Sequence, residues 1–360
     1  MRVLYISDCY FPRVNGVATS IRNFRESLKE IGVDSTLVCP SYDDESFDTD
    51  IHRVPSRIAP FSSEDRMMRW KSLSNTLLYL QFESRKFDLV HVQTPFLAHH
   101  AGVRFAKRMR IPAIFTYHTH FEHYLHEYVR FLPRSCGRGL ARALTRSQAK
   151  DVRAIVAPSH EAADVLRGYG IKTPVMVIPT GLSKEAFVFG NLRRFREKYR
   201  VSSPIMLYAG RVAREKNIPF LLVVLKFVME TIPNMTLVIA GDGPAREEIE
   251  RAALEMGIMR NVRVLGYLDQ ATDLRDAYSA ANVFVSASCT ETQGLAALEA
   301  RAQGIPAILL EDGTNDARSF AKRVVTKIFG SSVINRETAL ECSSERMAVK
   351  MRDLYQSLLT

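Results

Sequence analysis

The sequence predicts an α/β protein made of two Rossmann-like, doubly wound domains. Three observations support this fold class: short β-branched runs alternate with amphipathic segments, the strand candidates are too many for one ordinary sheet, and the chain has 360 residues. Such alternation is typical of parallel sheets with helices on both faces. A chain of this length exceeds what one hydrophobic core usually supports, so we expect two domains of ordinary size.

The first half of the chain holds one group of strand candidates. Each is a short apolar run, often β-branched, bounded by polar or glycine-containing sequence, as expected for a buried parallel strand. In chain order they are "RVLYIS" (2–7), "DSTLVC" (34–39), "DLVHVQ" (88–93), "PAIFTY" (112–117), "AIVAP" (154–158) and "VMVIP" (175–179).

The second half holds another group, and strand character lapses between the two. The later runs are "IMLYAG" (205–210), "MTLVIAG" (235–241), "VRVLG" (262–266), "NVFVSAS" (282–288) and "PAILL" (306–310). We predict an N-terminal domain over 1–182, a linker over 183–203, a C-terminal domain over 204–345 and a final helix over 346–360. Two such domains would face each other across a cleft, because ligands of open α/β sheets bind at the carboxyl ends of the strands.

The net charge of +10 favours phosphate-bearing partners such as nucleotides, anionic lipids or nucleic acids. Arg138, Arg142, Arg146 and Lys150 recur at intervals of four and form one basic stripe on a predicted helix. This basic stripe is either a solvated helix face or a surface that lies on an anionic membrane. No recognised nucleic-acid-binding motif accompanies it, so we expect no nucleic-acid partner.

The sequence gives no sign of export. No apolar run has the length of a membrane span, and the chain begins directly with a strand candidate. The five cysteines are scattered and lack CxxC spacing, which argues against a disulfide framework or a zinc site. We therefore expect a cytoplasmic protein with reduced cysteines.

Two strand ends in the second half carry residues suited to phosphate. Arg211 directly follows a strand candidate, and Lys216 lies in the approach to the next helix. Arginine offers a planar fork and lysine a point charge, so together they suit a diphosphate. The turn "GDGP" at 241–244 ends the next strand and opens a helix; its glycines allow close approach of the backbone, and the helix N-terminus favours anions.

A third strand end in this half places two glutamates eight positions apart. Glu291 precedes a helix that we predict to start near Gln293 or Gly294, and Glu299 lies about 12 Å further along it at 1.5 Å per residue. The two carboxylates therefore suit two parts of one extended ligand. The alternative is that Glu291 only favours the helix dipole and Glu299 is a solvated helix residue. The amides near the helix start belong to Thr292, Gln293, Gly294 and Leu295.

Histidines are dense in "TYHTHFEHYLHEY" (116–128), a feature that metal sites share. No cysteine pair, HExxH motif or carboxylate pair at a strand end accompanies them in the first half. We therefore expect a polar pocket and no metal, with zinc as the alternative. The first strand-to-helix turn lacks the GxxxxGK and GxGxxG fingerprints, which argues against a nucleoside triphosphatase or a dehydrogenase.

In order and spacing, "GRVAREKN" (210–217), "GDGP" and "SCTETQGLAALEARAQGIP" (288–306) resemble the retaining glycosyltransferases of family 4, which have the GT-B architecture. "SDCYFPRVNGVATSI" (7–21) resembles the N-terminal glycine loop of that family, the histidine-rich segment its acceptor side, and "VIPTGL" (177–182) its interdomain linker. The longer "YHTHFEHYLHEYVRFLP" is similar to the branch that glycosylates diacylglycerol-type lipids.

The resemblance implies roles for particular residues. Arg211, Lys216 and Gly16 would bind the donor diphosphate, and His118 would line the acceptor side near the anomeric carbon. Glu291 would act at the transferred sugar, together with Thr292, Gln293, Gly294 and Leu295. The nucleoside would lie against Glu299, Gly241, Gly266 and Tyr267. Because cationic groups face the departing diphosphate, the reaction would need no metal and no cofactor beyond the UDP- or GDP-linked sugar.

The implied function is hexosyl transfer, with retention, from a nucleoside diphosphate sugar to a membrane lipid or lipid-linked glycan. The basic stripe would hold the enzyme on the inner face of the cytoplasmic membrane. The alternatives are a soluble sugar acceptor and a non-catalytic subunit that keeps the fold. After Leu310 the chain reads "EDGTNDARSFAKRVV", where the family usually has a further strand, a glycine-rich turn and a longer loop. In the family the last helix commonly crosses back onto the first domain, and here that helix would lie within 346–360.

Overall fold

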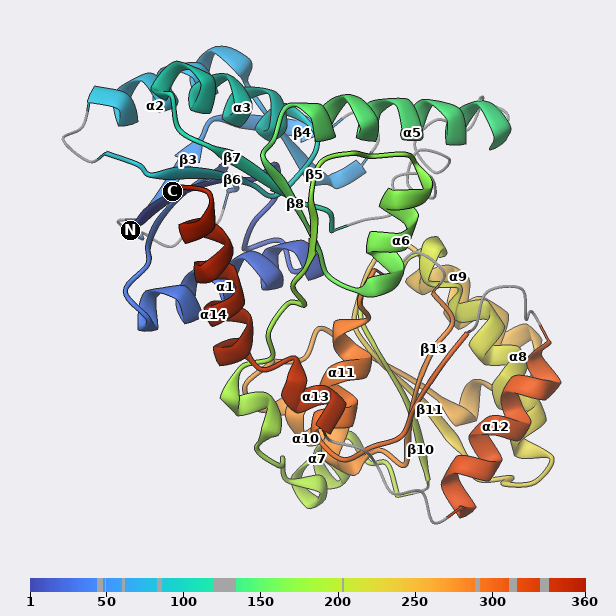
Figure 1. Cartoon of the computed structure of the whole chain (residues 1–360). Helices are drawn as coiled ribbons and strands as arrows, with labels where there is room; N and C mark the ends of the chain where they lie inside the picture. The colour runs from blue at the N-terminus through green and yellow to red at the C-terminus, as the bar shows by residue number, and fades with distance from the viewer. Residues whose placement is uncertain are drawn as a thin grey trace. The chain divides into compact units, whose positions relative to one another are not determined.

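The computed structural model describes the chain except for residues 44–47, 49, 60–61, 83–85, 119–133, 203, 289–291, 311–315 and 331–336. The chain divides into two compact units, the first made of Met1–Gly181 with Ser344–Thr360 and the second of Leu182–Ser343. Each unit contains a parallel sheet with helices on both faces (Figure 1). The predicted α/β class with two doubly wound domains is confirmed.

The first unit is built on a seven-stranded sheet with the order β3-β2-β1-β6-β7-β8-β9, in which all neighbours are parallel. Its strands are β1 (Arg2–Ile6), β2 (Asp34–Pro40), β3 (Ile51–Val54), β6 (Leu89–Val92), β7 (Ala113–Thr116), β8 (Ala154–Ala157) and β9 (Val175–Val177). A separate antiparallel hairpin joins β4 (Ser56–Ala59) to β5 (Ser62–Met68).

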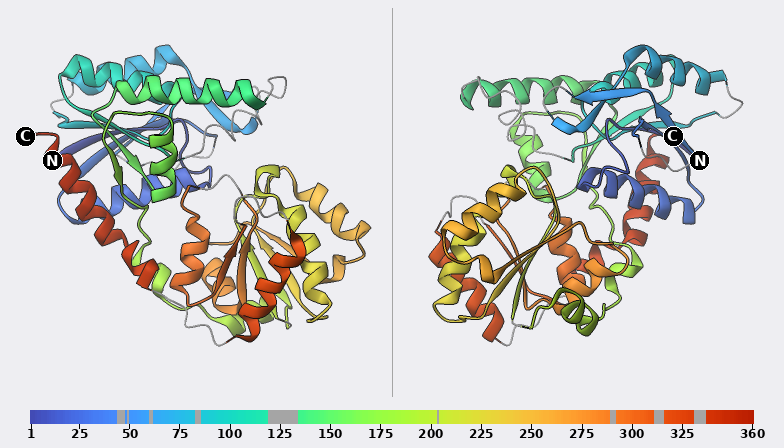
Figure 2. Two further views of the ribbon diagram at one scale, coloured as in Figure 1. Left: turned by 45° about the vertical axis from the view of Figure 1, so that its right-hand side comes forward. Right: turned by 180° about the vertical axis from the view of Figure 1, so that it is seen from behind.

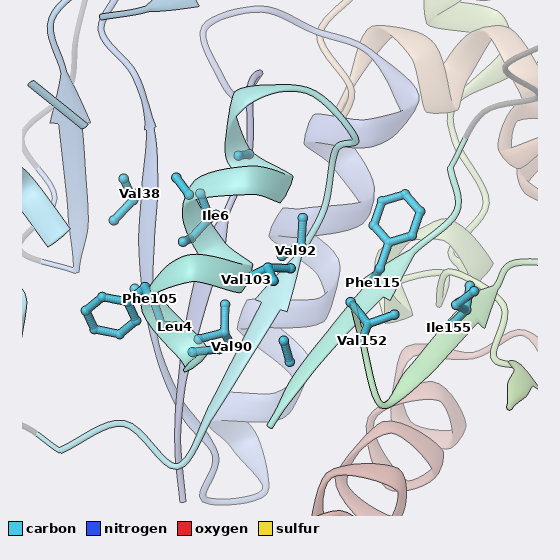
Figure 3. Packing of buried hydrophobic residues seen from close by; sticks show 14 of the residues in the cluster. Leu4, Ile6, Val38, Val90, Val92, Val103, Phe105, Phe115, Val152 and Ile155 are labelled. Carbon is cyan, nitrogen blue, oxygen red and sulfur yellow. The ribbon is translucent and has the colours of Figure 1, made fainter. Parts of the chain in front are cut away.

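Helices cover both faces of this sheet because successive strand residues point to opposite sides. Leu4 and Ile6 pack on one face with Val90 and Val92, in a core that extends to Phe105 of α3 (Figure 3). The helices of this face are α2 (Trp70–Phe82), α3 (Leu97–Met109), α5 (Arg134–Lys150) and α6 (His160–Gly168). The other face is covered by α1 (Gly16–Glu30) and α14 (Ser344–Ser357).

The last helix belongs to the first unit, where α14 lies beside α1 (Figures 1 and 2). Its apolar face, which includes Met351 and Tyr355, is fully buried against the same core as Phe24 of α1. The chain returns at a tight crossing, since a Cβ on Gly181 would lie 2.4 Å from the Cα of Ser344. Only glycine permits this approach.

The second unit is built on a five-stranded parallel sheet with the order β12-β11-β10-β13-β14. Its strands are β10 (Ile205–Ala209), β11 (Thr236–Ala240), β12 (Val262–Gly266), β13 (Val283–Ser286) and β14 (Ala307–Leu309). Its α-helices are α7 (Leu192–Tyr199), α8 (Ile218–Met229), α9 (Arg246–Glu255), α10 (Asp273–Ala280), α11 (Leu295–Ala302), α12 (Ala317–Phe329) and α13 (Glu337–Glu341). Short 3-10 helices are η1 (Lys184–Phe187), η2 (Arg214–Lys216) and η3 (Met259–Asn261).

Cores on the two sides of this second sheet place α8, α9 and α12 on one face and α7, α10 and α11 on the other. In the part of the chain that the structure describes, no strand follows β14, and α12 packs against α8. The strands β10, β11, β12 and β13 are parallel, so their carboxyl ends lie at the same end of the sheet. The residues that follow these strands are therefore close together.

Every predicted strand is present, and three further strands were not predicted. The edge strand β3 reads "IHRV", and the hairpin strands read "SRIA" and "SSEDRMM". These polar sequences lack the β-branched runs by which buried parallel strands are recognised. Pairing with β2, or between β4 and β5, determines their structure instead.

Candidate functional site

The turn after β10 carries Arg211 and Lys216, the two cations predicted to bind a diphosphate. The hydroxyl of Tyr208 donates to the carbonyl of Arg211 at 2.9 Å, which fixes the backbone where the strand ends. The Arg211 guanidinium pairs with Glu215 at 2.9 Å, and both side chains are largely buried. Lys216 ends η2 and is half-buried. The strand end thus holds two cations within one short turn, and Glu215 is a partner that the sequence analysis did not identify.

Glycines bring the ends of β10, β11 and β12 into direct backbone contact. A Cβ on Gly241 would lie 1.8 Å from the carbonyl oxygen of Gly210, so no other residue fits there. Gly241 also forms a bridge with Gly266, and the exposed Tyr267 follows directly. The predicted nucleoside residues Gly241, Gly266 and Tyr267 are therefore neighbours at this edge. Packing alone accounts for glycine at Gly241.

The carboxylate of Glu299 is held by a residue from a neighbouring helix. The hydroxyl of Tyr278 in α10 donates to Glu299 Oε2 at 2.7 Å, and the Tyr278 ring is buried against Phe284. Glu299 is half-buried in α11 and is not simply a solvated helix residue. Tyr278 was missed because nothing in the sequence marks a contact across 21 positions.

The loop between β13 and α11 contains the residues predicted to meet the transferred sugar. Glu291 lies outside the described residues. Helix α11 begins at Leu295 with Gly294 as its N-cap in the left-handed conformation, slightly later than predicted. The amides of Ala297 and Leu298 reach back to the Gly294 carbonyl, whereas earlier amides have no acceptor within the helix. Thr292 and Gln293 are half-buried just before this helix start.

In the first unit, Gly16 is the first residue of α1. The Asn15 side chain caps this helix by accepting from the Ala18 amide at 2.8 Å. Among the described residues, no atom lies within 4 Å of a Cβ built on Gly16, and its φ is not left-handed. Neither packing nor backbone conformation therefore requires glycine at this position.

His118 lies just past the end of β7 and contacts Gln93, which follows β6. The ring Nε2 and Gln93 Oε1 are 2.9 Å apart. Burial lowers the pKa of His118 to about 3, so its ring is neutral at physiological pH. Gln93 was not identified from sequence, although it occupies the same kind of strand-end position as Arg211.

Asp8 adds a half-buried carboxylate just after β1 that the sequence analysis also missed. Thr94 donates to Asp8 Oδ2 at 2.7 Å, and the Ala98 amide in the first turn of α3 donates to Oδ1 at 3.1 Å. Burial raises the pKa of Asp8 to about 6, although these hydrogen bonds oppose the rise. The strands β1, β6 and β7 are neighbours, so Asp8, Gln93 and His118 lie along one edge of the sheet. The rule that selected Arg211 would also have found Asp8, since it follows a strand directly.

The basic stripe lies on α5, where Arg142, Arg146 and Lys150 are exposed; the side chain of Arg138 lies outside what the structure describes. Two of its members contact Tyr169, the residue that follows α6. Arg142 lies over the Tyr169 ring at 5.4 Å, and Arg146 Nε donates to the Tyr169 carbonyl. These two arginines therefore have an intramolecular role, whatever else they bind.

Three further features bear on the predictions. Within the described ranges, no group of three or more histidine, cysteine or acidic side chains is arranged to hold a metal ion. A cavity of about 500 Å³ in the second unit is lined by residues of the α7 and α10 region, including Phe189 and Arg275, and by none of the predicted donor residues. Among the helices that the structure describes, none combines the length and the hydropathy needed to cross a bilayer.

Comparison with known proteins identifies both halves of the chain. The family described as Glycosyltransferase Family 4 matches residues 14–185, and the family described as Glycosyl transferases group 1 matches residues 192–321. The chain is 33% identical over 319 residues to an alpha-monoglucosyldiacylglycerol synthase of Streptococcus pneumoniae, covering 86% of this chain and 70% of that protein. It is 26% identical to a protein of the same name from Acholeplasma laidlawii, covering 88% of this chain and 82% of the relative.

Solved structures share the fold over the whole chain. The HepE protein of Anabaena, in complex with UDP, superposes with a TM-score of 0.76 at 14% identity, covering 99% of this chain and 100% of that one. A sucrose-phosphate synthase from Thermosynechococcus elongatus gives a TM-score of 0.78 at 20% identity, covering 99% and 98%. The chain therefore belongs to glycosyltransferase family 4 and is a glycosyltransferase with the two-domain GT-B fold.

Proposed function

We propose that this glycosyltransferase moves a hexose from a nucleoside diphosphate sugar to a diacylglycerol-type membrane lipid, with retention at the anomeric carbon. The observation that carries the proposal is the 33% identity, over 86% of the chain, to a relative named for making alpha-monoglucosyldiacylglycerol. An alpha-linked product formed from an alpha-linked sugar nucleotide requires retention. A plant relative at 26% identity is named as a sulfoquinovosyl transferase, which supports the glycolipid direction.

The donor side follows from the second unit. As the bond to the sugar breaks, negative charge develops on the departing diphosphate, and Arg211 and Lys216 stabilise it. Glu299, oriented by Tyr278, accepts hydrogen bonds from the ribose hydroxyls. Glu291 and the amides before α11 contact the transferred sugar. The UDP complex of HepE supports a nucleoside diphosphate as the leaving group, while relatives named as GDP-mannose-dependent keep guanosine as the alternative base.

The acceptor side follows from the first unit. His118 is a neutral ring at the carboxyl edge of the sheet, and Asp8 is a carboxylate whose pKa of about 6 suits proton exchange near neutrality. His118 and Asp8 suit a hydroxyl acceptor. Gly16 leaves open space beside the start of α1, where backbone amides would approach the donor phosphate or sugar.

Exposed side chains of α5 support the proposed membrane attachment. Lys150 is exposed with Arg142 and Arg146, and Leu140 and Leu144 on the same helix are 43% and 42% exposed. Basic and apolar groups on one exposed helix favour an anionic lipid surface. The enzyme would then reach a lipid hydroxyl without extracting the lipid from the bilayer.

The test is a transfer assay with the purified full chain. Radiolabelled UDP-glucose or GDP-mannose is supplied with vesicles that contain diacylglycerol, with and without phosphatidylglycerol, and the organic phase is analysed for an alpha-linked glycolipid. We expect product with one sugar nucleotide and more product on anionic vesicles. Lys216→Ala is the inactive control.

Other outcomes identify the rivals. Transfer to a soluble sugar but not to lipid would replace the lipid acceptor. Binding of nucleotide without transfer to any acceptor, or hydrolysis, would favour a non-catalytic subunit. Failure to bind either sugar nucleotide would refute the donor site itself.

A further inference from the structure

Two polar pairs cross between β6 and β7 on the same face of the first sheet. His91 and Gln93 are two positions apart along β6 and its extension, as are Thr116 and His118 along β7, so each couple points the same way. His91 Nε2 lies 2.6 Å from Thr116 Oγ1, and His118 Nε2 lies 2.9 Å from Gln93 Oε1. The second pair lies nearer the carboxyl edge, where ligands of such sheets bind.

The first pair is anchored deep in the core. His91 Nδ1 lies 2.7 Å from the hydroxyl of Tyr355, which lies 2.7 Å from the hydroxyl of Tyr5. His91, Tyr355 and Tyr5 are fully buried, and burial holds the pKa of His91 well below its usual value. The contacts join the C-terminal helix to β1, β6 and β7. They hold the two strands in a fixed position below Gln93 and His118.

The second pair determines where the proton of His118 resides. A carboxamide oxygen only accepts hydrogen bonds, so with the Gln93 amide oriented as in the structure, the ring nitrogen that faces Oε1 carries the hydrogen. In a neutral imidazole the other nitrogen, Nδ1, is then the acceptor. Gln93 is only 1% exposed, and its amide nitrogen is buried without a hydrogen-bond partner among the described residues. A donor in that position is costly unless a ligand or water accepts from it.

We propose that Gln93 is a positioning residue that holds His118 in its Nε2–H tautomer, so that Nδ1 accepts a hydrogen bond from the substrate hydroxyl. The Gln93 amide group donates to the same substrate. This assignment rests on the proposed transfer function for its substrate, but the tautomer is a property of the chain alone. In the alternative, the contact between Gln93 and His118 only satisfies two polar groups of the fold and does not determine which ring nitrogen faces the substrate.

The tautomer is measured directly by long-range ¹H–¹⁵N correlation spectra of the full chain with ¹⁵N-labelled histidine. Loss of a signal set in His118→Gln assigns the ring. We expect the Nε2–H pattern in the wild type and in Gln93→Glu, which keeps an acceptor. Gln93→Met removes the acceptor and should populate the Nδ1–H form. An Nδ1–H pattern in the wild type, or an unchanged tautomer in Gln93→Met, would overturn the proposal.

Two further readouts separate positioning from folding. The carboxylate of Gln93→Glu should raise the pH at which His118 titrates, which the same spectra follow. In the transfer assay, Gln93→Met should lower kcat about 10- to 100-fold, the range found when the partner of a metal-bound histidine is removed, without changing KM for the sugar nucleotide. A matched control is Gln148→Met, because Gln148 is also a buried glutamine of the first unit but donates to the Pro95 carbonyl.

The outcomes distinguish this inference from the proposed function. If the chain transfers no sugar, the spectra still decide the tautomer. If the chain transfers sugar and both Gln93→Met and Gln148→Met keep the kcat of the wild type, Gln93 has no positioning role. A melting temperature close to that of the wild type shows that each variant is folded.

Discussion

At the scale of single residues, the proposed diphosphate contact of Arg211 competes with an ion pair inside its own turn. Glu215 is 14% exposed and Arg211 19%, so replacing Arg211 would leave a poorly solvated carboxylate behind. Lys216, which ends η2 in the same turn, offers a second position for the experiment.

Lys216→Ala should weaken binding of the free nucleoside diphosphate by roughly 10- to 100-fold, since one charge-assisted contact contributes about 1.5 to 3 kcal/mol. Titration calorimetry with UDP and GDP measures it. Arg214→Ala is the matched control, because Arg214 is an exposed cation of the same turn that pairs with Glu248. Equal losses in the two variants would assign the effect to general charge.

Glu299 and Glu291 should differ in what they bind. Glu299→Ala should weaken the free nucleoside diphosphate, whereas Glu291→Ala should spare it and reduce transfer of the sugar. Tyr278→Phe removes the hydroxyl 2.7 Å from Glu299 and should reproduce part of the Glu299 effect. Nucleotide binding that is equally impaired in the two glutamate variants would contradict this division of roles.

The residue scale also shows which site features a sequence can reveal. Arg211 and Asp8 come just after strands, Lys216 lies in the turn after one, and strand ends can be located from apolar runs. The contacts that Tyr278 and Gln93 make cannot be found this way, because they join residues that the fold alone brings together. Local sequence therefore indicates which groups occupy the edge but not which groups orient them.

At the scale of elements, the sequence predicts buried strands better than exposed ones. The central strands are continuous apolar runs because helices cover both of their faces. Strand β3 forms only by pairing with β2 at the sheet edge, and α5 keeps apolar groups exposed beside basic ones. Such elements depend on neighbours or external partners, so composition alone does not determine their role.

The basic stripe on α5 should attach the enzyme to anionic vesicles. Lys150→Gln should lower partitioning about fivefold, since one basic residue near such a surface contributes about 1 kcal/mol. Sedimentation with neutral and anionic vesicles at low and high salt measures this, and added salt should weaken the binding. Lys107→Gln is the control, because Lys107 is an exposed cation on α3 that pairs with Asp151. Equal binding to neutral vesicles would leave the stripe as a solvated face.

At the scale of the whole molecule, the return of the C-terminal helix to the first unit depends on contacts between distant parts of the chain. Sequence periodicity indicates a helix near the end but not its partner. The contact of Tyr355 with His91 joins residues 264 positions apart. The division into two parallel sheets could be predicted from the sequence, because alternating strands and helices leave few other arrangements.

Tyr355→Phe tests how much this contact stabilises the packing of the C-terminal helix on the first unit. It leaves His91 Nδ1 and the Tyr5 hydroxyl without their shared partner inside the core, which should cost about 1 to 3 kcal/mol of stability in the first unit. The sequence has one tryptophan, and Trp70 lies in that unit, so its fluorescence during denaturation follows the correct part of the molecule. Met351→Leu in the same helix conserves volume and should cost less. An unchanged denaturation midpoint for Tyr355→Phe would mean that the hydrogen bonds of the Tyr355 hydroxyl make no net contribution to the stability of the first unit.

The stability of the first unit should fall as the pH drops below 6.5, because buried histidines resist protonation. Burial lowers the pKa of His99 to about 4, so its neutral ring stabilises the fold fully above 6.5, and this contribution is lost between about 6.5 and 4. Burial of Asp8 acts in the opposite direction, because its raised pKa of about 6 makes the folded state bind a proton sooner. His91 and His118 add to the effect of His99, so the histidines outweigh the single aspartate.

His99→Leu isolates one of these groups. Both ring nitrogens of His99 are buried without hydrogen-bond partners among the described residues, so leucine should be tolerated at pH 7. Relative to the wild type, the variant should gain about 1.4 kcal/mol per pH unit between 6.5 and 4, the linkage expected for one proton. Denaturation followed by Trp70 at several pH values measures the gain, and His100→Leu at the exposed neighbouring position is the control. A pH dependence unchanged in His99→Leu would show that this ring is protonated equally in the folded and unfolded states.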